Sequence, residues 1–174
     1  RQARGVAPPR SWNSSDRAAD TSASPASPSS ARCGSSAAWA RMPPFPDAGA
    51  ALGLLREAGL AVGVLTNTAT AAAEAALEAA GLRSALELVV GTDQVGAFKP
   101  DPRIYGRGCE RAGCDPEEAC LVAAHGWDVM GAARAGLRTG WVGRRERALS
   151  RAVPAPDVRG EGLLEVAEGV ARLG

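Results

Sequence analysis

The chain has 174 residues, of which 45% are hydrophobic, and its formal net charge is +1. This length and composition suffice for one domain with a sizeable core, and the near-zero charge gives no electrostatic reason to expect nucleic-acid binding. No apolar run approaches the roughly 20 residues of a membrane-spanning helix, and the start lacks the apolar segment of a signal peptide. We therefore expect a cytoplasmic protein that does not bind membranes.

The cysteine pattern also excludes several classes of site. The four cysteines form no CxxC pair and have no zinc-type spacing with the single histidine, His125; they are Cys33, Cys109, Cys114 and Cys120. Neither a metal knuckle nor a disulfide framework is indicated, so we expect reduced thiols.

Residues 1–42 differ in composition from the rest of the chain. They hold ten Ser, ten Ala and six Arg but no Leu, Ile or Phe. Such a segment cannot bury enough apolar surface to offset its ordering entropy, so we expect a disordered or non-native leader. A targeting presequence is the alternative, although the amphipathic apolar stripe of such a segment is missing. Met42 is the first methionine, which favours out-of-frame or misassigned sequence before it.

Residues 43–174 alternate regularly between helical and strand patterns. Asp47 precedes an apolar-periodic run that ends at Gly59, as a capped helix does. Further helices are predicted at 70–80, 102–111, 129–135 and 163–173, and strands at 61–65, 86–90, 120–124 and 139–142. This alternation predicts an α/β fold with a doubly wound parallel sheet, whose ligands lie at the carboxyl ends of the strands.

Thr66 and Asn67 follow the strand predicted at 61–65, so they would project into that crevice. A hydroxyl and an amide can donate hydrogen bonds to an anion without adding a competing charge. The local alternative is that these residues and Thr68 form an ST-turn that caps the next helix. Taken alone, the two residues favour the turn.

Lys99 begins the segment KPDPRIY, in which Pro100 favours an extended backbone and Asp101 can cap the following helix. A fixed ammonium group can stabilise a neighbouring carboxylate nucleophile and the charge of a transition state. An exposed lysine before a turn is the simpler interpretation of an isolated Lys-Pro pair.

His125, Trp127 and Asp128 follow the strand predicted at 120–124. Their structural alternatives are a helix-capping or packed histidine, a core aromatic residue, and an N-cap for a helix that starts at Val129. For Asp128, the capping role and a catalytic role are compatible.

Together, the segments VLTNT, AFKPDPRIY and LVAAHGWD resemble three of the four motifs of the haloacid dehalogenase superfamily, and most nearly its type II 2-haloacid dehalogenase branch. The resemblance covers about 130 residues. It implies that Thr66 helps hold the substrate carboxylate or reacting oxygen and that Asn67 helps cradle the departing halide. It further implies that Lys99 stabilises the nucleophile, with Tyr105 close by.

The third motif distinguishes the branches of the superfamily. Phosphatases of the superfamily usually present two acids there, because Mg²⁺ needs carboxylate oxygens around it. Here the first acid position is His125, and type II dehalogenases have Asn or His there, often have Trp before the Asp, and require no metal. The resemblance thus implies no metal and no cofactor, with Asp128 pairing with Lys99 to position or activate water. Ala123 departs from the serine that is common at its position, which affects the substrate-orienting network.

The fourth motif, a DxYGT-like stretch that carries the aspartate nucleophile after an apolar strand, is not found. Neither Asp16 nor Asp20 follows such a strand. In the family this strand lies between the strands that carry the Thr66 and Asp128 turns. We therefore expect a core without the nucleophile strand and the helical cap domain, in which the neighbouring strands lose backbone partners. MPPFPDAG at 42–49 resembles the junction where the cap returns to the core.

Two classes of function follow. The first is a hydrolase that displaces halide from a small 2-haloacid through an aspartyl ester, for which this chain would hold only the supporting residues and be inactive as given. The second is a non-catalytic remnant or interaction module, whose incomplete sheet accepts a strand from a partner or from a second copy in a homodimer. A metal-dependent phosphatase is a third interpretation, disfavoured by His125.

Overall fold

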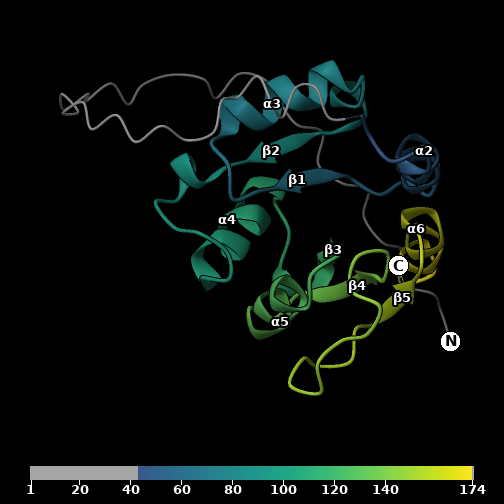
Figure 1. Ribbon diagram of the computed structural model, residues 1–174. Helices are drawn as coiled ribbons and strands as arrows, with labels where there is room; N and C mark the ends of the chain where they lie inside the picture. Colours follow the sequence, from purple (N-terminus) through teal and green to yellow (C-terminus); the bar gives the residue numbers. More distant parts are fainter. Residues whose placement is uncertain (1–42, 174) are drawn as a thin grey trace, which may run out of the picture. The chain divides into compact units, whose positions relative to one another are not determined.

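The computed structural model describes residues 43–173, so the expectations for the leader at 1–42 lie outside the described residues. In the described part, strands and helices alternate along the chain (Figure 1). The strands are β1 (Gly63–Leu65), β2 (Leu88–Val90), β3 (Cys120–Ala123), β4 (Arg138–Val142) and β5 (Val158–Gly160). The α-helices are α2 (Ala48–Glu57), α3 (Thr70–Ala79), α4 (Pro102–Ala112), α5 (Gly126–Arg134) and α6 (Leu163–Ala171).

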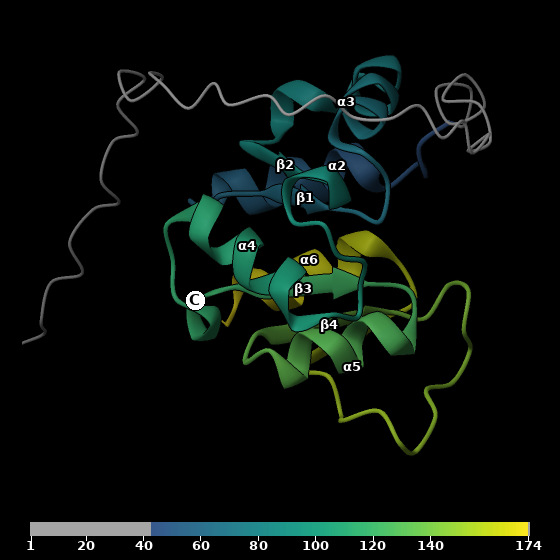
Figure 2. The ribbon, with the colours of Figure 1, turned by 90° about the vertical axis from the view of Figure 1, so that its left-hand side faces the viewer.

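Every strand pairing in this part of the chain is parallel, which confirms the predicted α/β class. β1 pairs with β2, with Val64 opposite Val89, and β4 pairs with both β3 and β5. The strands form two separate sheets, β1–β2 and β3–β4–β5. β1 and β3 are the facing edges of the two sheets (Figures 1 and 2), and within residues 43–173 neither has a strand partner on that side.

The burial of the strands follows this division. Four of the five residues of β4 are buried, whereas every residue of β3 is only half-buried and Gly63 of β1 is exposed. Strands in the middle of a doubly wound sheet are normally covered on both faces and hydrogen-bonded at both edges. Within residues 43–173, β1 and β3 therefore have the burial of edge strands.

Helix α4 connects the two sheets through a small, fully buried cluster. Ile104 and Tyr105 of α4 pack with Ala132 of α5, and side chains from both sheets, including Leu65 of β1 and Leu121 of β3, pack against them. Helices α3 and α4 contact the β1–β2 sheet, while α5 and α6 cover opposite faces of the other sheet (Figures 1 and 2). Side chains from both sheets therefore meet at α4.

The start of α4 confirms the prediction from local sequence. Asp101 is the N-cap, and its carboxylate accepts the backbone N–H of Arg103 at 2.9 Å, while Pro102 occupies the first helical position. The helix ends at Gly113, whose φ of 67° suits glycine. These local signals mark both ends of α4, and Tyr105 is its fourth residue.

Helix α5 begins at Gly126, three residues before the predicted start, and its N-cap is His125. The interpretation of Asp128 as an N-cap is therefore wrong: Asp128 lies in the first turn. The physical reason is a contact distant in sequence. The carboxylate of Glu146 accepts the Gly126 N–H at 2.8 Å, so a backbone donor of the first turn is satisfied and the helix can start about one turn before Val129. The interpretation of Trp127 as a core aromatic is also wrong, since 40% of this residue is exposed.

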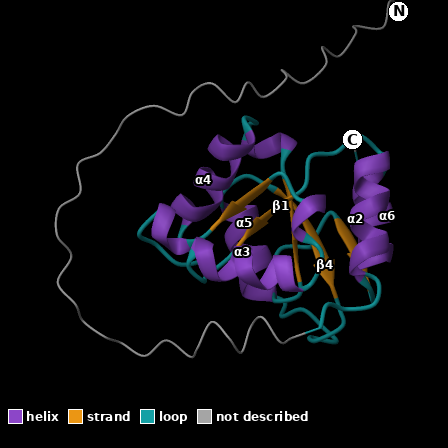
Figure 3. Ribbon diagram, turned by 90° about the horizontal axis from the view of Figure 1, so that it is seen from above, coloured by secondary structure: helices purple, strands orange, loops and turns teal. Residues whose placement is uncertain are grey.

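Asp47 stands at the N-cap position of α2, as predicted, but its side chain does not cap that helix. It accepts the backbone N–H of Leu163, the first residue of α6, at 2.8 Å, and pairs with Arg144 at 2.5 Å. Helices α2 and α6 lie side by side (Figures 1 and 3), and Asp47 links their N-terminal ends.

Two further findings concern the expectations from composition. Cys109, Cys114 and Cys120 are free thiols, and Cys33 lies outside the described residues. Among residues 43–173, no helix combines the length and the apolar character that crossing a bilayer requires.

Candidate functional site

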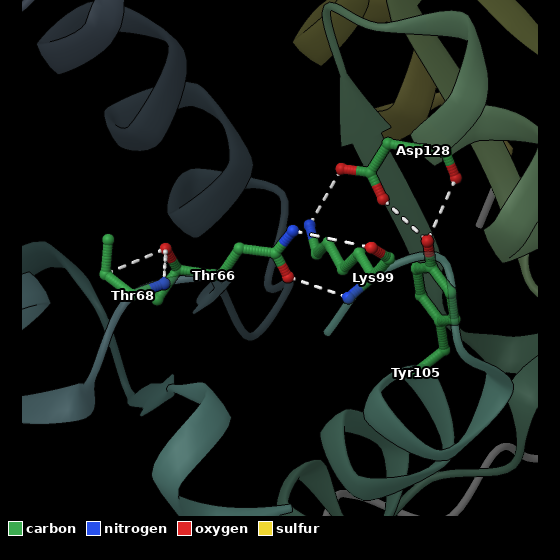
Figure 4. Close-up of polar contacts among 6 residues, drawn as sticks. Thr66, Thr68, Lys99, Tyr105 and Asp128 are labelled. Atoms are coloured by element: carbon green, nitrogen blue, oxygen red, sulfur yellow. Dashed lines mark hydrogen bonds and ion pairs between the residues drawn. The ribbon is translucent and has the colours of Figure 1, made fainter. Parts of the chain in front are cut away.

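Lys99, Tyr105 and Asp128 form a buried polar cluster (Figure 4), and Asp128 lies in the first turn of α5, the helix that follows the carboxyl end of β3. The Lys99 Nζ donates to Asp128 Oδ2 at 2.8 Å, and the Tyr105 Oη donates to Asp128 Oδ1 at 2.8 Å. The side chains of Lys99 and Asp128 are only 8% and 11% exposed. Both carboxylate oxygens of Asp128 therefore have a fixed donor in a largely dehydrated setting.

Tyr105 is the second hydrogen-bond donor to Asp128 in this cluster. It is fully buried, and its burial, together with its hydrogen bond to the Asp128 carboxylate, raises its pKa well above the ordinary value. The phenol therefore keeps its hydrogen at neutral pH. Asp128 also lies in the first turn of α5, where the helix dipole favours a negative charge.

Asn67 connects the turn after β1 to the backbone of Lys99. Its Oδ1 accepts the Lys99 N–H at 2.7 Å, and its Nδ2 lies 3.5 Å from the Lys99 carbonyl oxygen. The structure thus brings Asn67 and Lys99 together across 32 positions of sequence. The amide oxygen of Asn67 is used by the protein backbone, and the side chain braces the segment that presents the Lys99 ammonium.

Thr66 forms the predicted ST-turn, but this turn does not cap α3, whose N-cap position is Ala69 and has no side-chain cap hydrogen bond. Its Oγ1 accepts the Thr68 N–H at 3.2 Å and lies 3.0 Å from the Thr68 hydroxyl (Figure 4). This is the geometry of an ST-turn, and both of these contacts go to Thr68. Thr66 therefore stands beside the polar cluster without a hydrogen bond to it among the described residues.

His125 and Trp127 form a second group of contacts at the N-terminal end of α5, the helix that also carries Asp128. Their rings stack with centroids 5.9 Å apart and an interplanar angle of 14°. Glu146, in the connection between β4 and β5, lies 3.0 Å from His125 Nδ1 through Oε1 and accepts the Gly126 N–H through Oε2. The hydrogen bond from the Gly126 N–H, and to a smaller extent the contact with His125, hold the pKa of the Glu146 carboxyl below its usual range.

Glu146 was not found by sequence reasoning. It lies in the arginine-rich stretch RRER, 20 positions after Gly126, and has no local motif around it. Only the fold brings it to the start of α5.

The chemistry of the cluster is that of a single carboxylate between a cation and a phenol. Within the described residues, no group of three or more His, Cys, Asp or Glu side chains is arranged to hold a metal ion. A fixed ammonium beside a carboxylate is suited to stabilising a second anionic group, and the carboxylate is suited to accepting a proton from water.

These features define an α/β protein whose polar cluster lies where ligands bind in such sheets. A profile of the haloacid dehalogenase-like hydrolases matches residues 13–136, and the chain belongs to that family. The matched range includes Asp16 and Asp20, which lie outside the residues that the structure describes.

Two curated relatives are similar to this chain over more than 100 residues. The chain is 36% identical over 108 residues to (S)-2-haloacid dehalogenase 4A of Burkholderia cepacia, covering 62% of this chain and 47% of that protein. It is also 39% identical over 127 residues to a phosphoserine phosphatase of Thermus thermophilus, covering 72% and 51%. The chain thus spans about half the length of these relatives.

Among solved structures, the chain is similar to the L-2-haloacid dehalogenase of Xanthobacter autotrophicus with chloropropionic acid covalently bound. The TM-score is 0.73 at 26% identity, with 79% of this chain and 64% of that one covered. The similarity confirms the fold that the sequence motifs implied.

Proposed function

We propose that residues 43–173 form the supporting half of a hydrolase that releases halide from small 2-haloacids. The observation that carries this proposal is the buried pair of Lys99 and Asp128, with its 2.8 Å contact at the carboxyl ends of the strands. In this proposal the aspartate nucleophile is supplied from outside the described residues. The dehalogenase relatives and the chloropropionic acid bound to the Xanthobacter enzyme support the substrate class.

The proposed reaction has two steps. A carboxylate oxygen of the nucleophile attacks the carbon that carries the halogen, and the halide leaves with the bonding electron pair. Water then attacks the carbonyl carbon of the resulting ester, which releases the 2-hydroxyacid and restores the carboxylate. Lys99 holds the nucleophile and offsets negative charge in both steps, and Asp128 accepts the proton of the attacking water. Thr66 and Asn67 lie on the turn after β1, and Trp127 lies at the start of α5; in this proposal both segments border the substrate.

Halide release tests this proposal. We expect none from the chain as given, because its sequence contains no DxYGT-like stretch after an apolar strand. Placing the first strand and cap of the Burkholderia relative ahead of Pro43 should restore halide release from 2-chloropropionate. Lys99→Met in that fusion should reduce turnover by about 10²-fold or more. Release by the unmodified chain, or a folded but inactive fusion, would contradict the proposal.

A phosphatase assay distinguishes the proposed dehalogenase from a metal-dependent phosphatase. The Thermus relative is a phosphoserine phosphatase, but His125 occupies the position where an acid would help hold Mg²⁺. We therefore expect the fusion to leave phosphoserine and p-nitrophenyl phosphate intact when Mg²⁺ is present. Hydrolysis of either would favour the phosphatase.

The divided sheet favours a second candidate, a module that accepts a strand. β1 and β3 each have one free edge within the described residues, and both run in the same direction as their partners. Such edges can pair with a strand of another chain, including a second copy. Sedimentation velocity of the unmodified chain and the fusion distinguishes the two: self-association that the fused strand abolishes supports edge pairing, and a concentration-independent monomer in both argues against it.

A further inference from the structure

Glu146 makes a paired contact at the start of α5. One carboxylate oxygen, Oε2, accepts the Gly126 N–H at 2.8 Å, and the other, Oε1, lies 3.0 Å from Nδ1 of His125. An ionised carboxylate has only acceptor oxygens, so the second contact is a hydrogen bond only when Nδ1 carries a hydrogen. The low pKa of Glu146 keeps the carboxylate ionised at neutral pH.

The β4–β5 connection that carries Glu146 is packed directly against this helix end. A methyl group added at Gly126 would lie 3.0 Å from Leu149, 3.2 Å from Val153 and 3.3 Å from Glu146 Oε2. Because the backbone here has no side chain, the connection approaches closely and Glu146 reaches both of its partners. Trp127 stacks on the His125 ring.

We propose that Glu146 is a positioning residue, which holds the hydrogen of the neutral His125 ring on Nδ1 and leaves Nε2 free for substrate or water. The role given to Nε2 rests on the proposed function, while the tautomer is a property of the chain itself. A lone pair on Nε2 can accept a proton, and the protonated ring can donate its Nε2 hydrogen to an anion such as a departing halide. Glu146 would thus act on the site through His125.

The tautomer can be read directly, because His125 is the single histidine of the full chain. Long-range ¹H–¹⁵N correlation spectra of the ¹⁵N-labelled chain, recorded near pH 9 where an imidazole is ordinarily neutral, report which ring nitrogen is protonated. We expect the Nδ1 signal in the protonated region and the Nε2 signal in the unprotonated region.

Glu146→Gln should reverse this pattern. A glutamine that still accepts the Gly126 N–H through its amide oxygen turns its NH₂ group towards His125, so Nδ1 becomes an acceptor and the hydrogen moves to Nε2. Gly126→Ala should displace the connection and remove the preference for Nδ1. Glu117→Gln is the matched control, because Glu117 is exposed and its substitution removes the same charge. That variant should keep the wild-type pattern.

Amide-proton dispersion establishes that each variant is folded before the ring signals are compared. A wild-type chain with the hydrogen on Nε2, or a folded Glu146→Gln variant that keeps it on Nδ1, overturns the proposal. The proposed hydrolase function is judged separately, by halide release from the fusion. An inactive fusion with the expected tautomer counts against that function and leaves the assignment of Glu146 in place.

Discussion

Tyr105 donates a 2.8 Å hydrogen bond to Asp128, and this contact joins α4 to α5. Tyr105 is fully buried and donates to Oδ1 of Asp128, whereas Lys99 donates to Oδ2. The orientation of Asp128 is therefore determined by two donors from the same stretch of chain. Substitutions on either side of the contact test how much stability this orientation contributes.

Replacing Tyr105 with Phe removes the donor and keeps the packing of the ring. Asp128 Oδ1 is then left in a dehydrated setting without its partner, which should lower the free energy of unfolding by about 1–3 kcal/mol. Urea denaturation of the wild type and the variant measures the difference. A variant as stable as the wild type would show that water or a rearranged side chain replaces the phenol.

Gly131 allows Tyr105 to lie against α5. A methyl group at this position would contact the Tyr105 hydroxyl and lie 2.8 Å from the Cβ of Pro100. We expect Gly131→Ala to displace Tyr105 and destabilise the chain by about 1–3 kcal/mol, although alanine is the better helix former.

Gly106→Ala in α4 is the matched control, since an added methyl group there meets no atom within 4 Å. It should stabilise the chain by roughly 0.5–1 kcal/mol through helix propensity alone. Thermal unfolding of both variants compares them, and a stabilising Gly131→Ala would show that Tyr105 is not confined by this glycine.

Features that depend on neighbouring residues could be predicted from the sequence, whereas contacts between distant segments could not be predicted from local patterns. Asp101 and Pro102 predict the start of α4 because an N-cap and its helix are neighbours in the chain. The residues of the polar cluster were predicted from a family resemblance, which carries information on contacts between distant segments. Neither source of information includes Glu146, whose contact with Gly126 crosses 20 positions and depends on how the β4–β5 connection folds back.

The same limit applies to the strands and helix ends. β5 (Val158–Gly160) was not predicted, because three residues are too few to show an alternating pattern and two prolines, Pro154 and Pro156, precede it. The sequence predicts that the side chain of Asp47 caps the helix that follows it, yet this side chain accepts the backbone N–H of Leu163, 116 positions away. Local propensity identifies where a cap stands, while tertiary packing decides which helix it caps.

Asp47 should make stability depend on pH in a defined range. Its hydrogen bond to Arg144, followed by that from the Leu163 N–H, lowers the pKa of its carboxyl to about 2. Since the folded-state pKa is depressed, the stabilisation is present above the unfolded value near 3.8 and is lost as the pH falls towards about 2. The side chain is 21% exposed, so we expect a contribution of about 1–2 kcal/mol at neutral pH.

Asp47→Asn tests this because asparagine can still accept the Leu163 N–H but cannot pair as a charge with Arg144. The loss of stability should be constant between about pH 7 and 5 and should shrink towards zero near pH 2, as measured by urea denaturation. Glu87→Gln, at an exposed position, should show no such change. A difference that does not vary with pH would assign the effect of Asp47 to helix capping alone.

Lys99 and Asp128 should be coupled far more strongly than a surface ion pair. Lys99→Met leaves a carboxylate that is 11% exposed without its counter-charge, so we expect a loss of about 2–4 kcal/mol in the free energy of unfolding. Adding Asp128→Asn removes the unpaired charge and should recover part of that loss. Arg107→Met breaks a pair with Glu110 whose side chains are 39% and 69% exposed, and should cost less than about 0.5 kcal/mol. If Lys99→Met costs no more than Arg107→Met, Lys99 is the exposed lysine of the simpler interpretation, and the double-mutant cycle will show no coupling.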